Sequence, residues 1–171
     1  TFGATGFTNF QPRGIGVYKN RVYFFRRNTL KIHYGGVDAI TGTTTEFDMS
    51  TVFKNGGSLI FAGAITRSGA ISEEYFCAIS TKGEVIIYQG DYPGSTTWSV
   101  MNRLYIPPPI GIRAAFYFGG DILVITVQGV CSISQMLQGS PSPVFLTENI
   151  AKAYKVDALF AASQPHKDLC S

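Results

Sequence analysis

The fold is decided by one stretch near the middle of the chain, Tyr75-Phe76-Cys77-Ala78-Ile79-Ser80-Thr81-Lys82-Gly83-Glu84-Val85-Ile86-Ile87-Tyr88. Two apolar runs of strand length flank four residues of turn character. The glycine that ends this turn can adopt the positive φ that tight hairpin turns require. The stretch therefore predicts a β-hairpin.

Similar apolar runs, separated by short turns, recur on both sides of this hairpin. The other runs predicted as strands are 15–18, 22–25, 30–34, 46–49, 58–65, 98–106, 112–118, 122–127 and 130–133. Aromatic residues make up 13% of the 171 residues and charged residues only 15%, against about a quarter in an average globular protein. With 19 glycines and 8 prolines for turns, this composition predicts an all-β fold. It excludes a coiled coil, a helical bundle and a disordered tail.

The predicted strands fall into three groups that share one plan: a polar turn, a buried strand, a second turn and a shorter strand. The groups begin at 18–25, 56–61 and 119–125. Propeller blades are four-stranded units of about 40 to 50 residues. The chain is therefore predicted to form β-propeller-like blades, a partial propeller, over residues 14–138. A β-sandwich explains the same number of strands and is the alternative.

The two ends of the chain differ from this region. Residues 1–13 form a polar, glycine-rich N-terminal segment without the features of a signal peptide. Residues 139–171 are predicted to hold one C-terminal helix and a tail, because Thr147 can cap a helix and Glu148 would lie at the positive end of its dipole. The chain starts without methionine and is expected to be a piece of a longer polypeptide.

The chain carries a net charge of +3, which is less than a strong nucleic-acid binder usually shows. Its densest basic stretch contains Arg21, Arg26, Arg27 and Lys31. These four are the candidate DNA-facing or interface residues. A solvated turn without a binding role is the alternative for the same residues.

Cysteine, histidine and paired glutamate side chains are the other candidates for functional groups. Cys77 and Cys131 lie inside apolar runs, so both are predicted to be buried thiols in a protein that folds in a reducing compartment. His33 falls on the polar side of an alternating strand and is predicted to be a surface residue. Glu73 and Glu74 are predicted to be solvated turn residues, because neighbours on a strand point to opposite faces and cannot act as a pair.

No stretch of the sequence carries a recognised catalytic or ligand-binding pattern. A GxSxG nucleophile turn, a CxxC pair, a calcium loop and a phosphate-binding glycine loop are all missing. The longest apolar run has the length of a strand and is too short to span a bilayer. The sequence therefore predicts no enzyme, no catalytic residue, no cofactor, no metal and no membrane span.

Six short motifs, taken in order, resemble one protein family. They are GVYKNRVYFF (16–25), DAITGTTTEFD (38–48), FKNGGSL (53–59), STKGEVIIYQGDYP (80–93), WSV (98–100) and GGDILVIT (119–126). In this order and spacing they resemble tailed-phage and prophage virion proteins of the head-to-tail connector and tail-nozzle type. The resemblance covers residues 14–138, with a weaker trace in the helix that follows.

The resemblance implies a structural virion protein of the phage tail that is rich in β-propeller and has no catalytic residues. Such a subunit assembles into a homo-oligomeric ring, contacts other tail or connector proteins, and lets DNA pass through its lumen without reading the sequence. It would reside in the host cytoplasm before assembly. Family members continue after the helix into further strands, so another copy, another chain or further sequence is expected to close the propeller. The loop intervals 35–58 and 66–74 are the expected contact surfaces.

Two other functions stay open at this point. A carbohydrate-binding or glycan-cleaving propeller used in host recognition could stack sugar rings on Tyr88, Tyr92 and Trp98, although Trp98 is the better candidate for a core residue. A basic DNA-binding module would use the four basic residues named above and would bind in a salt-dependent way.

Overall fold

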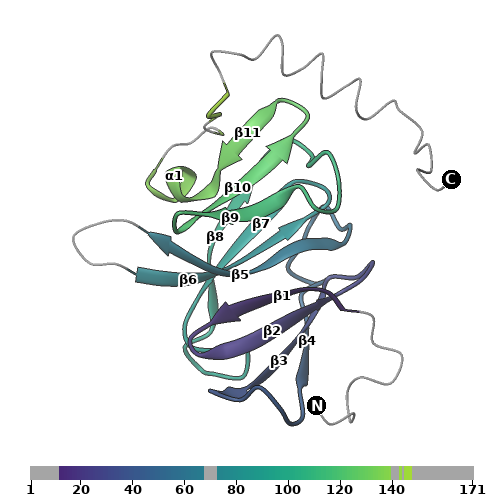
Figure 1. Cartoon of the computed structure of the whole chain (residues 1–171), viewed down its shortest axis with the longest axis vertical. Coiled ribbons are helices and arrows are strands. Elements are labelled where there is room, and N and C mark those ends of the chain that lie inside the picture. The colour runs from purple at the N-terminus through teal and green to yellow at the C-terminus, as the bar shows by residue number, and fades with distance from the viewer. Residues whose placement is uncertain (1–11, 68–72, 140–142, 144, 148–171) are drawn as a thin grey trace, which may run out of the picture.

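A computed structural model describes residues 12–67, 73–139, 143 and 145–147 of the chain (Figure 1). These residues form eleven strands and one short helix. The strands make three antiparallel sheets, and within each sheet the neighbouring strands follow one another in the chain. The predicted all-β fold is confirmed.

The three sheets lie in the order A, B, C from the bottom to the top of Figure 1. Sheet A contains β1 (Pro12–Tyr18), β2 (Arg21–Arg26), β3 (Lys31–Val37) and β4 (Thr45–Asp48). Sheet B contains β5 (Leu59–Arg67), β6 (Glu73–Ser80), β7 (Glu84–Gln89) and β8 (Ser99–Tyr105). Sheet C contains β9 (Ala115–Phe118), β10 (Asp121–Thr126) and β11 (Gly129–Ser132), and Phe145 adds a single bridge to β11. The three strand groups of the sequence are thus three separate open sheets, and the propeller arrangement stays a prediction.

The predicted central hairpin and its glycine turn are confirmed. β6 and β7 pair with Ala78 opposite Ile86, and Gly83 has a φ of 75°. The expected contact loop 35–58 is partly regular, because it contains the end of β3 and all of β4. Of the second expected loop, residues 68–72 lie outside the described residues.

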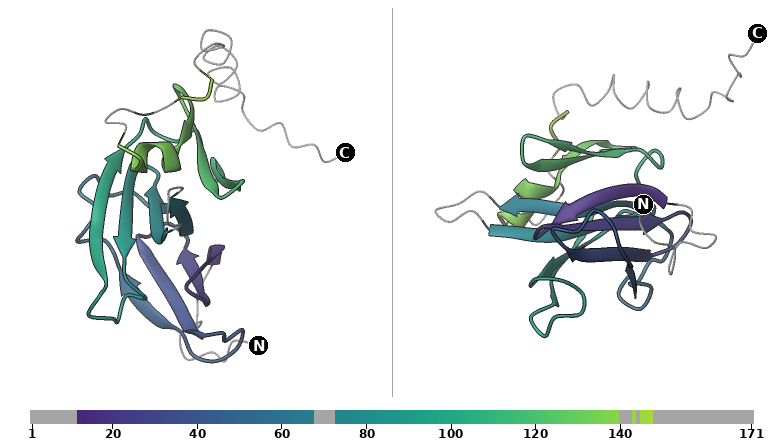
Figure 2. Two further views of the ribbon diagram at one scale, coloured as in Figure 1. Left: turned by 90° about the vertical axis from the view of Figure 1, so that its left-hand side faces the viewer. Right: turned by 60° about the horizontal axis from the view of Figure 1, so that its bottom comes forward.

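Sheet B lies between sheets A and C and buries both of its faces (Figure 1 and Figure 2). Successive side chains of a strand point to opposite faces, so Phe76 and Ala78 join the core shared with sheet A, whereas Cys77 and Ile79 join the core shared with sheet C. We call these the A–B core and the B–C core. A fully buried side chain of this size contributes about 1.5–3 kcal/mol to folding. The largest in the two cores are Tyr18, Tyr23, Tyr88, Phe76, Ile32, Met49, Leu59, Ile65, Ile79, Ile86, Ile87 and Ile122.

The first strands of the three sheets meet at one edge of this arrangement. A methyl group placed on Gly16 of β1 would lie 2.0 Å from the carbonyl oxygen of Ala62 in β5, so the two backbones are in direct contact. The ring of Tyr117 in β9 also reaches β5, where it packs edge-on against Phe61 with the ring centroids 4.9 Å apart. The close approach of sheets A and B therefore requires glycine at position 16.

The described helix, α1 (Ile133–Leu137), was not predicted from the sequence. Ser132 caps it by accepting a hydrogen bond from the Gln135 backbone N–H, and the Asp121 carboxylate accepts one from Ser134 N–H at 2.8 Å. Its apolar side chains are too few for a helical pattern to stand out from the strand before it. The helix predicted to start at Thr147 lies, beyond that residue, outside the described residues.

The prediction that His33 is a surface residue is wrong. His33 is only 5% exposed, because β3 is an inner strand and β2 and β4 place Phe24 and Glu46 directly beside it. Its Nε2 lies 3.4 Å from the Glu46 carboxylate. Burial lowers the pKa of His33, and the negative charge of Glu46 offsets this only in part.

The glycine contact between β1 and β5 can be tested with a methyl group. Gly16→Ala forces the two backbones apart and is expected to lower the free energy of unfolding by about 1–3 kcal/mol in a urea titration. Gly111→Ala is the matched control, because nothing lies within 4 Å of its added methyl group, and it should change stability by less than about 0.5 kcal/mol. Equal effects of the two substitutions would contradict the close approach.

Candidate functional site

The four basic residues predicted to face DNA do not form one patch. Arg21 stands at the start of β2, where its guanidinium donates to the Gly35 carbonyl at 3.0 Å and lies 4.2 Å from the centre of the Tyr92 ring. Arg26 ends the same strand and Arg27 follows it. The cation of Arg21 is thus held at one end of β2, away from the other two.

Lys31 is neutralised by acidic residues of the neighbouring strand. Its Nζ lies 2.6 Å from the Glu46 carboxylate and 3.5 Å from that of Asp48. These hydrogen bonds and charges raise the pKa of Lys31. The two acids of β4 compete with any phosphate that would approach this lysine.

The three aromatic residues considered for sugar stacking do not make an exposed platform. Tyr88 is 2% exposed and its ring stacks on that of Trp98, with centroids 4.8 Å apart and planes 15° apart. Trp98 is partly buried and packs against the A–B core, so the predicted core role is confirmed only in part. Tyr92 is half-buried beneath Arg21. The expectation that Tyr88 could stack on a sugar ring is therefore wrong, because its ring is buried.

The outer face of sheet C, which points away from sheet B, is apolar and open. Tyr117 points toward sheet B, so its neighbours Phe116 and Phe118 point the other way, and they are 40% and 67% exposed. Leu123 of β10 lies directly opposite Phe116 on the same face. We call this surface the C face. Large aromatic side chains exposed together mark an interaction surface.

The outer face of sheet A also exposes apolar side chains, on its first strand. Gly16 and Tyr18 of β1 point toward sheet B, so Ile15 and Val17 point outward, and they are 61% and 54% exposed. Charged groups of β3 and β4 lie on the same sheet, including the ion pair between Lys31 and Glu46. We call this surface the A face. It differs from the C face in chemistry, being part apolar and part charged.

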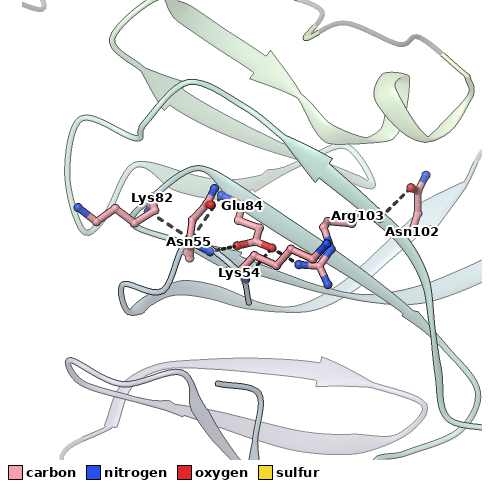
Figure 3. Close-up of polar contacts among 7 residues, drawn as sticks. Lys54, Asn55, Lys82, Glu84, Asn102 and Arg103 are labelled. Carbon is pink, nitrogen blue, oxygen red and sulfur yellow. Dashed lines mark hydrogen bonds and ion pairs between the residues drawn. The ribbon is translucent and has the colours of Figure 1, made fainter. Parts of the chain in front are cut away.

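A buried carboxylate holds the loop between β4 and β5 against sheet B (Figure 3). Glu84, at the start of β7, is fully buried and accepts hydrogen bonds from the backbone N–H groups of Lys54 and Asn55 at 3.1 Å and 2.8 Å. Arg103 of the neighbouring strand β8 forms an ion pair with the same carboxylate. Burial alone would raise the pKa of Glu84, but these donors outweigh it and the pKa is lowered. Such a saturated carboxylate is a structural anchor.

The predicted burial of the two thiols is confirmed. Cys77 and Cys131 are both 0% exposed and free of disulfide bonds. Burial raises the pKa of Cys131 to about 11 and raises that of Cys77 as well, so both are neutral thiols. Glu73 and Glu74 are exposed, as predicted, but they begin β6 instead of forming a turn.

Three arginines line one cavity that the sequence did not indicate. Arg27 shares this cavity with Arg13 of β1 and with Arg113, which precedes β9. Only Arg27 belongs to the basic stretch seen in the sequence. The other two are isolated in the chain and carry no motif, so the cluster exists only through the packing of sheet A against the segment leading to sheet C.

Metal-binding clusters and membrane-spanning helices are not found in the described part of the chain. Within it, no group of three or more His, Cys, Asp or Glu side chains could hold a metal ion. None of the helices described there is long and apolar enough to cross a membrane. The candidate sites are therefore the two outer faces and the arginine cavity.

Comparison of the chain with protein-family models, with curated proteins and with solved structures finds no match. The likeness to phage connector and nozzle proteins thus rests on the six sequence motifs. Function has to be argued from the surfaces and side chains described above.

The Glu84 anchor predicts a loss of stability and a change in acid sensitivity when its charge is removed. Glu84→Gln leaves Arg103 without its ion pair and is expected to lower the free energy of unfolding by about 2–4 kcal/mol. The lowered pKa means that the carboxylate stabilises the fold above pH 4.5 and that this contribution is lost as the pH falls through the folded-state value. The variant should therefore lose less stability than the wild type on acidification.

Glu46→Gln is the matched control for this experiment. It also removes an ion pair, with Lys31, but both partners are about a third exposed or more and exposed pairs contribute little. Urea titrations between neutral and acidic pH compare the two variants. If the two variants lost the same free energy of unfolding, Glu84 would contribute no more than an exposed ion pair.

Proposed function

We propose that this chain is a structural subunit of a phage tail, of the nozzle or head-to-tail connector type, that assembles head to tail with copies of itself into a ring around the DNA channel. The observation that carries the proposal is the pair of open outer faces, one on each outer sheet. Support for the phage tail in particular comes from the six motifs, and support for a role without chemistry comes from the saturated Glu84 carboxylate and the neutral thiols of Cys77 and Cys131.

The inner faces of sheets A and C show what kind of surface each outer face can bind. Each inner face is covered by apolar side chains of sheet B, which is an antiparallel sheet. The C face repeats this kind of surface, since it exposes Phe116 and Phe118, with the buried Leu123 beside Phe116. The fitting occupant is another sheet of the same kind, and a second copy of the chain provides one.

The two faces differ, and this decides the symmetry of the assembly. A contact between two C faces would be a closed two-fold dimer. A contact between the C face of one copy and the A face of the next leaves one face of each kind free, so that it continues until the ring closes. Ile15 and Val17 supply the apolar part of the A face for this contact. A rigid ring of this type guides DNA through its lumen by shape and needs no sequence readout.

The head-to-tail contact can be tested with variants that each block one face. Phe118→Arg blocks the C face and Ile15→Arg blocks the A face, because each buries a charge in an apolar contact. Wild-type protein is expected to form rings, seen by light scattering and electron microscopy, and each variant alone should be monomeric. In an equal mixture, the intact C face of the Ile15→Arg variant can bind the intact A face of the Phe118→Arg variant. The other two faces of this pair are blocked, so the mixture should form dimers and nothing larger.

Val100→Arg serves as the control, because Val100 is 43% exposed on β8 of sheet B, outside both faces. It should leave ring formation unchanged, and thermal unfolding should show that all three variants are folded. Rings that persist in both blocked variants, or wild-type protein that stays monomeric at high concentration, would refute the assembly.

Gold-labelled antibody against the chain should bind the tails of phage particles, and binding elsewhere on the particle would refute the location.

A further inference from the structure

A cavity of about 380 Å³ opens where sheet A, strand β5 and the segment before β9 meet. Its lining residues are Pro12, Arg13, Phe25, Arg27, Ile60, Ile112, Arg113 and Ala115. The cavity thus combines three guanidinium groups with apolar walls, and no acidic side chain belongs to this lining.

The positive charge in this cavity is not balanced by the described residues. The Nε and Nη2 atoms of Arg13 are buried and have no hydrogen-bond partner within the part of the chain that the structure describes. Loss of solvent lowers the pKa of Arg13, and the neighbouring positive charge of Arg27 lowers it further. Arg13 as a whole is only partly buried, but leaving two buried N–H groups of a cation without hydrogen bonds is costly, so the arrangement is that of a site prepared for an anion.

We infer that this cavity binds a phosphate group, either as inorganic phosphate or as the end of a small phosphate ester, through Arg13, Arg27 and Arg113. Guanidinium groups match phosphate well because their fixed N–H donors can form two parallel hydrogen bonds to its oxygens. A doubly charged phosphate with several acceptor oxygens can engage three arginines at once, whereas a carboxylate has one charge and two oxygens. The apolar walls of Phe25, Ile60 and Ile112 leave room for a small organic group on the phosphate.

The position of the site gives the bound anion a structural effect. Arg13 and Arg27 belong to sheet A and its turn, and Arg113 belongs to the segment that leads into sheet C. A phosphate held by all three would join sheet A directly to that segment, beside sheet B. Because it binds the folded state, it raises the unfolding temperature, by an amount that grows with the logarithm of the phosphate concentration above the dissociation constant. This inference does not depend on assembly into a ring.

The site can be tested by titrating the full chain with inorganic phosphate. Phosphate replaces chloride in the buffer, so that the ionic strength stays constant. Calorimetry is expected to show saturable binding, and the unfolding temperature should rise with phosphate. Arg13→Gln should weaken binding at least tenfold. It should also raise the unfolding temperature in phosphate-free buffer, because it removes a partly buried cation with two unpaired N–H groups that lies beside another cation. If Arg13 had only a structural role, the substitution would instead lower the unfolding temperature in every buffer.

Arg26→Gln is the matched control, because Arg26 is the sequence neighbour of Arg27 but does not line the cavity. It should change phosphate affinity by less than twofold. Phenyl phosphate distinguishes the two forms of the ligand: tighter binding than that of inorganic phosphate identifies an ester site that uses the apolar walls, and equal or weaker binding identifies a site for the free anion. The inference is overturned if phosphate and chloride stabilise the wild type equally, or if the Arg13 and Arg26 variants bind alike.

Discussion

The burial of the β6–β7 hairpin on both faces is the constraint on which the rest of the structure depends. Phe76 and Ala78 point to one side and Cys77 and Ile79 to the other, and all four are 0% exposed. A sheet that is apolar on both faces cannot be stable in water by itself. Sheets A and C are therefore needed as covers, and the three-layer order follows. The Glu84 anchor belongs to the same hairpin and ties the loop between sheets A and B to it.

The same constraint explains why the outer faces are open. Sheet B can cover only one face of each neighbour, so the opposite faces of sheets A and C have no partner sheet among the described residues. On the C face this leaves Phe116 and Phe118 exposed, and on the A face Ile15 and Val17. The proposed ring and the layered fold thus have one physical origin: each sheet has two faces, and the stack ends on faces that another sheet can cover.

The strands and the main hairpin could be predicted from the sequence because their signals are local. Apolar runs of strand length, and a glycine where the turn at position 83 needs a positive φ, are visible within a few residues. The burial of Cys77 and Cys131 followed from their apolar neighbours in the same way. The exposure of His33 was misjudged because alternation shows that a strand has two faces but not which neighbouring strands cover them. The arginine cavity was missed because Arg13 and Arg113 meet only through tertiary packing.

The claim that the β6–β7 hairpin is the centre of the fold is tested most directly by native-state hydrogen exchange, resolved residue by residue. If the hairpin holds the three sheets together, the amides of Cys77, Ala78 and Ile86 exchange only when the whole protein unfolds, with a free energy equal to that of global unfolding. Amides of the outer sheets then exchange at the same free energy or lower. Exchange of the hairpin amides at a lower free energy than those of β2 or β10 would contradict the account, because sheet A or sheet C would then persist without the hairpin.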